Sequence, residues 1–116
     1  MAKIEKFEDI IAWQKAQQLV LAIYLELKNC KDYSFRDQIQ RASISIMNNI
    51  AEGYERKGDK EFKHFLFIAK GSCSEVRSML SVADKLGYIP DHQTKELTDL
   101  TCEITKMLTV FISKLD

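Results

Sequence analysis

The sequence predicts an all-helical protein: an antiparallel four-helix bundle with up-down-up-down topology, formed as a single domain by residues 1–116. Three observations predict this class. Apolar residues recur at spacings of three and four, which places them on one face of a helix. The single proline and most of the four glycines fall near the ends of these periodic segments. No stretch alternates apolar and polar residues for long enough to indicate a strand.

The composition indicates a globular protein with a core of its own. Hydrophobic residues make up 46% and charged residues 29% of the 116 residues, a balance that argues against disorder. The 17 basic residues cancel the 17 acidic ones, so any basic surface must be local. The N-terminal residues lack the apolar stretch of a secretory signal, and no apolar run is long enough to span a bilayer. We therefore expect a cytoplasmic location and no membrane contact.

The first helix is expected over residues 8–29. Its apolar rhythm runs through Ile10, Trp13, Val20, Tyr24 and Leu27. Further apolar residues widen this face: Ile11, Leu19, Leu21, Ile23 and Leu25. We therefore expect this helix to be covered on more than one side.

The second and third helices are expected over residues 35–57 and 59–86. Ser34, followed by Asp37, resembles a capping box that starts the second helix, and Asp59 can cap the third. Gly53 and Gly58 should loosen the chain between them. Because 56–60 contains a single glycine, this link could be a kink rather than a turn.

The fourth helix is expected over residues 92–115. Gly87 can take the left-handed conformation that closes a helix, Pro90 prevents continuation, and Asp91 offers a new cap. The links between the helices are short, and short links between long helices favour antiparallel neighbours.

A stripe of polar residues on the second helix does not fit a plain core. It continues onto the third helix, and its members are Gln38, Arg41, Ser45, Asn49, Glu52, Ser72 and Glu75. We interpret this polar stripe as a half-buried hydrogen-bonding surface for packing or an interface, with a buried ion pair between Arg41 and Glu75. The alternatives are a solvated helix face and a solvent-facing Glu75.

Nothing in the sequence predicts catalysis, a cofactor or a metal site. The cysteines Cys30, Cys73 and Cys102 form no C-x-x-C pair, so we expect reduced thiols in or near the core. Glu61 and His64 match one Glu-x-x-His unit of a di-metal bundle, but no second unit exists. Phosphate-binding glycine loops and nucleophile elbows are also missing.

A cluster of basic residues near the second link is the candidate site for nucleic acid. Its members are Arg56, Lys57, Lys60, Lys63 and Lys70. Phosphate binding needs local positive charge rather than a positive total. The alternative is a solvated turn, because Glu52, Glu55, Asp59 and Glu61 dilute the cluster.

Four segments carry a family resemblance over nearly the whole chain: FEDIIAWQKA, DQIQRASISIMNNIAEGYER, EFKHFLFIAKGSCSEV and LGYI. They resemble the bacterial four-helix-bundle family whose genes were first noticed within intervening sequences of 23S rRNA genes. The family's signature positions correspond here to the polar stripe together with Trp13, Gly53 and Gly71.

The resemblance implies a left-handed bundle that assembles with copies of itself as a five-fold ring. A related accessory protein of diversity-generating retroelements is similar in fold, has a basic surface and associates with nucleic acid and a reverse transcriptase. The zero net charge of this chain departs from that branch. Two hypotheses follow: a non-enzymatic homopentameric scaffold that binds RNA or an RNA–protein complex through the basic cluster, or a protein-interaction module with no nucleic-acid role.

Overall fold

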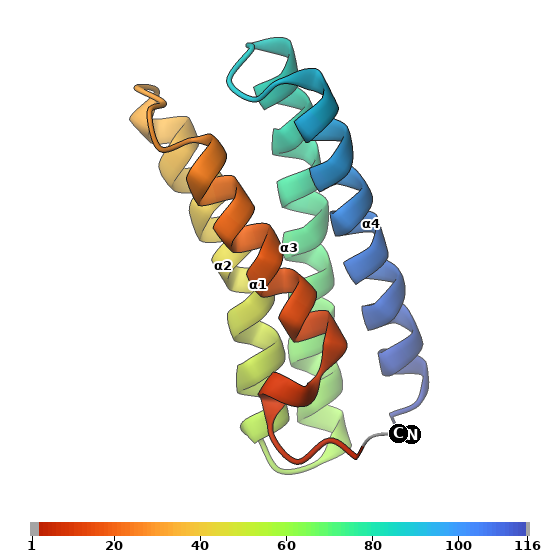
Figure 1. Ribbon diagram of the computed structural model, residues 1–116. Coiled ribbons are helices and arrows are strands. Elements are labelled where there is room, and N and C mark those ends of the chain that lie inside the picture. The colour runs from red at the N-terminus through yellow and green to blue at the C-terminus, as the bar shows by residue number, and fades with distance from the viewer. Residues whose placement is uncertain (1–2, 116) are drawn as a thin grey trace.

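Four long helices account for most of residues 3–115, which the computed structural model describes. They are α1 (Ile11–Glu26), α2 (Tyr33–Glu55), α3 (Asp59–Lys85) and α4 (Asp91–Ser113), preceded by a 3-10 turn, η1 (Phe7–Asp9). Figure 1 shows successive helices running in opposite directions along a bundle of 42 × 25 × 19 Å. Within residues 3–115 there is no strand, and the predicted all-helical four-helix bundle is confirmed. Its left-handed twist stays a prediction.

Contacts at the two ends of the bundle identify the neighbouring helices. At one end Tyr88 Oη donates to Asp32 Oδ2 at 2.7 Å, and Gln93 Nε2 donates to Glu26 Oε2 at 2.8 Å. At the other end the rings of Phe62 and Phe111 lie 5.2 Å apart. Among the described residues no Cα atom of α1 lies within 8 Å of one in α3, and none of α2 lies within 8 Å of one in α4, so each of these pairs is diagonal.

The first helix is shorter than the sequence predicted. The Asp9 carboxylate accepts hydrogen bonds from the backbone N–H groups of Glu5 and Lys6, which closes the chain into η1 instead of an α-helical turn. Ile10 is then extended, and α1 begins only at Ile11. The helix ends at Glu26, before the predicted 29, because Leu27 leaves the helical conformation and is buried in the core.

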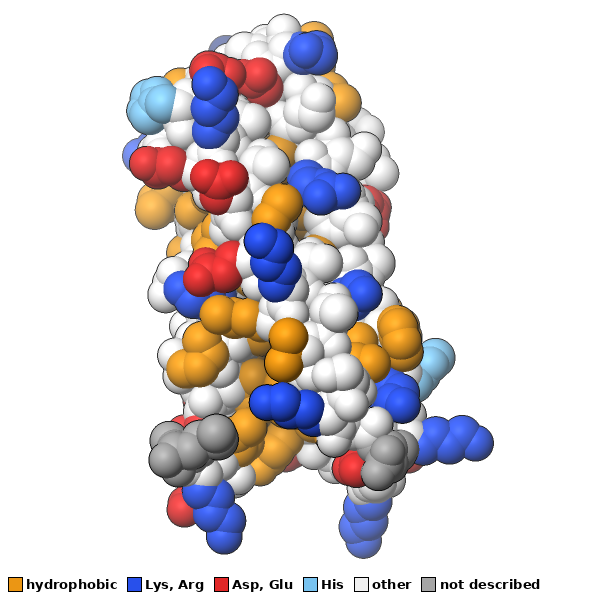
Figure 2. Space-filling view, turned by 90° about the vertical axis from the view of Figure 1, so that its right-hand side faces the viewer, with side chains coloured by type: hydrophobic (Ala, Val, Ile, Leu, Met, Phe, Trp, Pro, Cys, Tyr) orange, Lys and Arg blue, Asp and Glu red, His pale blue; other side chains and the backbone are white. Residues whose placement is uncertain are grey.

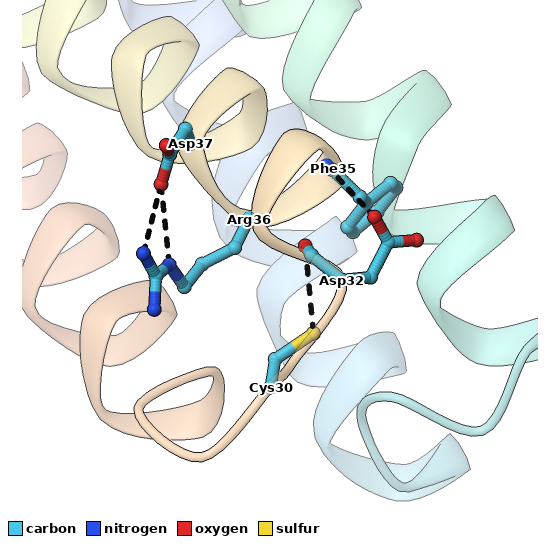
Figure 3. Close-up of polar contacts among 5 residues, drawn as sticks. All are labelled: Cys30, Asp32, Phe35, Arg36 and Asp37. Carbon is cyan, nitrogen blue, oxygen red and sulfur yellow. Dashed lines mark hydrogen bonds and ion pairs between the residues drawn. The ribbon is translucent and has the colours of Figure 1, made fainter.

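The expected capping box at Ser34 is wrong. Asp32 caps α2, because its Oδ1 accepts a hydrogen bond from the Phe35 backbone N–H at 3.2 Å (Figure 3). Ser34 lies in the first turn and is exposed. The Asp37 side chain accepts two hydrogen bonds from the neighbouring Arg36 instead of closing a box.

The other two helix starts also differ from the expected caps, although by a single residue. Gly58, with φ of 100°, takes the cap position of α3, and Pro90 takes that of α4, so Asp59 and Asp91 each lie in a first helical turn. Their carboxylates still face the positive end of the helix dipole. The link between α2 and α3 is a true turn, and Gly87, with φ of 72°, closes α3 as predicted.

The core is a continuous apolar cluster drawn from all four helices. Buried polar side chains are satisfied within it: Thr94 and Thr101 donate to backbone carbonyls of their own helix or its cap. No helix within residues 3–115 is both long enough and apolar enough to cross a membrane.

α1 is covered by both α2 and α4, as expected, but its outer side is not covered by the rest of the chain. Ala12, Ala16 and Ile23 turn toward the core, whereas Leu21 is 58% exposed and Leu25 is 68% exposed. A single apolar stripe of small and large residues is therefore enough to seat α1 on the bundle.

The three cysteines are free thiols at different depths. Cys73 is buried on α3, while Cys30 and Cys102 are half-buried. Burial raises the pKa of the Cys73 thiol to about 11. The expectation of unpaired thiols in or near the core agrees with this arrangement.

Gly53 lies inside α2 and does not loosen it as predicted. Its backbone packs against Phe62 and Phe65 of α3, and a Cβ built at Gly53 would lie 2.7 Å from the Phe65 Cβ and 3.0 Å from Phe62 Cδ1. Glycine is therefore required here for the close approach of two helices, not for a turn.

We expect Gly53→Ala to lower the free energy of unfolding by about 1 kcal/mol or more, because overpacking costs about 1–3 kcal/mol and outweighs the gain in helix propensity. Urea unfolding measures the change. Asn48→Ala, at an exposed position of the same helix, is the control and should be neutral or slightly stabilising. A Gly53→Ala protein as stable as the wild type would contradict the close packing.

The hydrogen bond from Tyr88 lowers the pKa of Asp32 below its ordinary value of 3.8, with the Phe35 N–H as a second cause, and the same bond raises the pKa of Tyr88. The stabilisation is present above the unfolded pKa of Asp32 and is lost as pH falls through the lowered value. At the alkaline end it is lost as pH rises through the raised Tyr88 pKa.

Tyr88→Phe should therefore raise the Asp32 pKa, and its destabilising effect should shrink in acid. A carboxyl-carbon NMR titration measures the shift. Tyr33→Phe is the control, because Tyr33 is not the hydrogen-bond partner of Asp32. An unchanged Asp32 pKa in Tyr88→Phe would show that the bond is absent in solution.

Candidate functional site

The turn between α2 and α3 presents four members of the basic cluster at one end of the bundle, and the fifth, Lys70, lies further along α3. Arg56 ends α2, Lys57 lies in the turn, and Lys60 and Lys63 lie in the first two turns of α3. The left-handed conformation of Gly58 reverses the chain here. Lys57 and Lys60 are exposed, and Lys63 is half-buried.

Arg56 differs from the lysines around it. Its guanidinium donates to Glu52 at 2.9 Å, approaches Glu61 at 3.9 Å and lies 5.1 Å from the centre of the Phe65 ring. Two carboxylates therefore offset its charge. Within residues 3–115, Lys57, Lys60 and Lys63 form no ion pair, so they carry the positive charge of the turn.

A basic row continues along the side of α3 that adjoins α4. Lys63, Lys70 and Arg77 are spaced by seven residues, which repeats a helix face at intervals of about 10.5 Å. Arg77 Nη1 lies 3.8 Å from Cys102 Sγ of α4, and Lys70 Nζ lies 6.0 Å from the centre of the Phe67 ring. No member of this basic row forms an ion pair with a residue in the described part of the chain.

The centre of the polar stripe joins α2 to α3 by hydrogen bonds. Ser72 Oγ donates to Ser45 Oγ at 2.9 Å, and Asn49 Nδ2 donates to Ser45 Oγ at 3.0 Å and to the Ser45 carbonyl at 2.8 Å. Ser72 is buried, and Ser45 and Asn49 are half-buried. These three residues hold the two helices in register.

The rest of the polar stripe is exposed in the single chain. Arg41 and Glu75 face the same hollow of about 520 Å³ between α2 and α3, which Gln38, Ser45 and Asn49 also line. Both charged side chains are exposed, and they form no ion pair with each other. The expected buried pair is therefore wrong for the single chain, because both side chains are exposed to solvent. Glu52 belongs to the turn through its bond to Arg56.

An apolar hollow of about 550 Å³ lies where the C-terminal half of α4 meets the N-terminal strap, by which we mean residues 3–10. Met107, Val110 and Phe111 line it with Ile4, and Lys106 and Lys114 lie at its rim. Figure 2 shows hydrophobic side chains gathered in the lower half of this face, with Lys or Arg side chains beside them. A second hollow, of about 430 Å³, adjoins it and shares Ile4, Met107 and Phe111.

Two features of the surface were missed by sequence reasoning. Arg77 extends the basic row, and its seven-residue spacing from Lys63 and Lys70 was the signal that could have revealed it. The apolar hollow depends on how residues 4–12 fold back onto α4, and no local sequence pattern predicts that contact.

The histidines lie far apart in the fold. His64 is on the second turn of α3, and His92 is on the first turn of α4 at the other end of the bundle. Among residues 3–115 no group of three or more His, Cys, Asp or Glu side chains could hold a metal ion.

The fold and the polar junction between α2 and α3 define a four-helix-bundle protein with a conspicuously polar second helix. The family model described as "23S rRNA-intervening sequence protein" matches residues 8–110. The chain therefore belongs to this family, as its motifs indicated. Trp13, one of the signature positions, is half-buried against the Phe7 ring at 5.3 Å.

A solved structure is similar over most of its length. It is a protein of unknown function from the S23 ribosomal protein family of Bacteroides thetaiotaomicron, 23% identical, with a TM-score of 0.82 over 90% of this chain and 96% of the other. This likeness supports the fold. No curated protein matches the chain in sequence.

The different burial of Ser72 and Glu75 can be tested by measuring how each substitution changes the free energy of unfolding. Ser72→Ala should lower the free energy of unfolding by about 1 kcal/mol, because it removes a partly buried hydrogen bond. Glu75→Ala should change it by less than about 0.5 kcal/mol, as for other exposed sites. Chemical denaturation measures both, with Ser81→Ala as the exposed serine control. A loss of several kcal/mol at Glu75 would mean that the carboxylate is buried in solution.

Proposed function

We propose that this chain is a non-catalytic, self-assembling scaffold that binds RNA or an RNA–protein complex. The binding surface consists of Lys57, Lys60, Lys63 and Lys70, extended by Arg77. The observation that carries the proposal is that these cations lie on one side of α3 and its preceding turn without a carboxylate partner among residues 3–115. Unpaired cations can exchange their counterions for phosphates.

Self-assembly would strengthen such a surface. One subunit has no net charge, so its long-range attraction for RNA is weak. In a ring, expected to have five members from the family resemblance, the basic turn of each subunit would repeat around the axis and its field would add. Arg56 then has a supporting role, because its carboxylate partners and the Phe65 ring fix the shape of the turn.

A protein-interaction module is the second candidate. It is favoured by the apolar hollow around Val110, whose rim lysines suit an acidic, amphipathic partner segment. On this alternative the partner would bind beside α4, and RNA would have no part in it.

Replacing Lys57, Lys60, Lys63 and Lys70 together with Gln should weaken RNA binding and reduce the slope of log K against log salt. The reduction should be about 0.7–0.9 for each phosphate that the variant no longer neutralises. Fluorescence anisotropy with a short structured RNA, measured over a salt series, gives both quantities.

The matched control replaces four lysines at the opposite end with Gln: Lys28, Lys31, Lys85 and Lys95. It should keep most of the binding. Equal loss in the two quadruple variants would indicate non-specific attraction, and a wild-type protein that ignores RNA at low salt would refute the RNA proposal. If the wild-type protein then binds a protein partner and the Val110→Glu variant does not, the second candidate is favoured.

A further inference from the structure

The outward side of α1 carries no charged residue. Ile11, Gln14, Gln18, Leu21 and Leu25 are all exposed there, and together they form what we term the α1 outer face. Three of them are large aliphatic side chains that are more than half exposed. An uncharged and largely apolar face of this length is unusual for a helix bordering water.

The two charges of α1 are both directed away from this face. Lys15 pairs with Glu103 of α4 at 3.4 Å, and Glu26 accepts a hydrogen bond from Gln93 of α4 at 2.8 Å. The α1 outer face is thus uncharged for two reasons. α1 has only two charged residues, and both of them point toward α4.

The outward side of α3 is largely uncharged over its middle. Phe67, Ile68, Gly71, Ser74, Ser78 and Val82 are exposed and form what we term the α3 outer face. One carboxylate, that of the exposed Glu75, lies among them, seven residues from both Ile68 and Val82, and it also lines the polar hollow. A Cβ built at Gly71 would meet no atom within 4 Å, so the backbone of α3 is open to close approach there.

The outer sides of the other two helices are charged. On α2 the exposed charged residues are Asp37, Arg41, Glu52 and Glu55. On α4 they include Glu96, Asp99, Glu103 and Lys106. The two faces with the fewest charges therefore belong to the diagonal pair α1 and α3, and they point away from each other.

The α1 and α3 outer faces are also similar in length. From Ile11 to Leu25 the α1 outer face spans about 21 Å, and from Phe67 to Val82 the α3 outer face spans about 22 Å. Each has large apolar side chains toward its ends and Gln, Ser or Gly between them. α1 and α3 run in the same direction, so the two outer faces lie parallel along the bundle (Figure 1).

We infer that the α1 outer face of one subunit packs against the α3 outer face of the next, with both subunits in the same orientation. The occupant of each face is a second copy of this chain. The inference rests on the proposed self-assembly and identifies the surfaces that carry it. A contact between two different faces is heterologous, and when its rotation closes it builds a ring instead of a two-fold dimer.

Two variants block one face each without touching the core. Leu21→Glu places a charge on the α1 outer face. Gly71→Gln adds a bulky uncharged side chain to the α3 outer face at a site with open space, where it also raises helix propensity. Multi-angle light scattering should show a multiple of the chain mass of 13.4 kDa for the wild type and the chain mass itself for both variants. The helical circular dichroism of the variants should be unchanged.

Val110→Glu is the matched control. Val110 is 52% exposed and lines the apolar hollow on α4 rather than the α1 or α3 outer face, so the variant should keep the wild-type mass. A Val110→Glu protein that dissociates while Leu21→Glu stays assembled would place the contact at the apolar hollow and overturn the inference.

Mixing the two blocked variants tests whether the contact joins unlike faces. The Gly71→Gln subunit keeps its α1 outer face and the Leu21→Glu subunit keeps its α3 outer face. The mixture should therefore form a complex of about 27 kDa, twice the chain mass of 13.4 kDa, and stop there.

The remaining outcomes distinguish the inferred contact between unlike faces from the proposed self-assembly. If Gly71→Gln stays assembled while Leu21→Glu dissociates, α1 pairs with itself and the inference is wrong. If both variants keep the wild-type mass, the inference is wrong but the proposed scaffold stands. A wild-type protein of 13.4 kDa would refute self-assembly itself.

Discussion

Phe62 and Phe65 lie directly against the backbone of α2 at Gly53, and this contact fixes the distance between α2 and α3. About two turns earlier in α2, the same close spacing brings Ser45 within hydrogen-bonding distance of Ser72. One steric contact and one polar contact on the same pair of helices prevent α2 from sliding along α3. The position of the basic turn between them follows from that fixed register.

The α2–α3 pair therefore forms a rigid half of the molecule to which α1 and α4 are added. The N-terminal strap connects the halves, since Tyr54 of α2 donates to the Ile4 carbonyl and Ile4 also lines the apolar hollow on α4. The surfaces proposed for RNA and for self-assembly use neighbouring sides of α3. The basic row adjoins α4 and the α3 outer face points away from the core, and the two meet where Lys70 Nζ lies 6.0 Å from the centre of the Phe67 ring.

Much of the fold could be predicted from the sequence, because helix-period apolar spacing over long segments is a strong signal. The core stripes of α3 and α4 and the closing role of Gly87 were predicted from such patterns. The ends of the helices were less predictable. Asp32, Ser34 and Asp37 are all suitable capping residues, and the one that caps α2 is Asp32, which also accepts a hydrogen bond from Tyr88, 56 residues away.

The site was predicted in part for the same reason. Residue type and spacing identified the Ser45, Asn49 and Ser72 network, but they could not tell whether Arg41 and Glu75 were buried, because burial depends on what lies opposite. Arg56 joined the basic cluster by its charge, although its nearest neighbours in space cancel that charge.

The depth of Cys73 has a consequence for chemical durability. Oxidation of a cysteine begins with its thiolate. With a pKa of about 11, the Cys73 thiol is almost entirely protonated at neutral pH, and only 1% of its surface is exposed. A bundle whose most sensitive core atom stays protonated can keep its packing under oxidative stress, while damage falls first on the half-buried thiols of Cys30 and Cys102 nearer the surface.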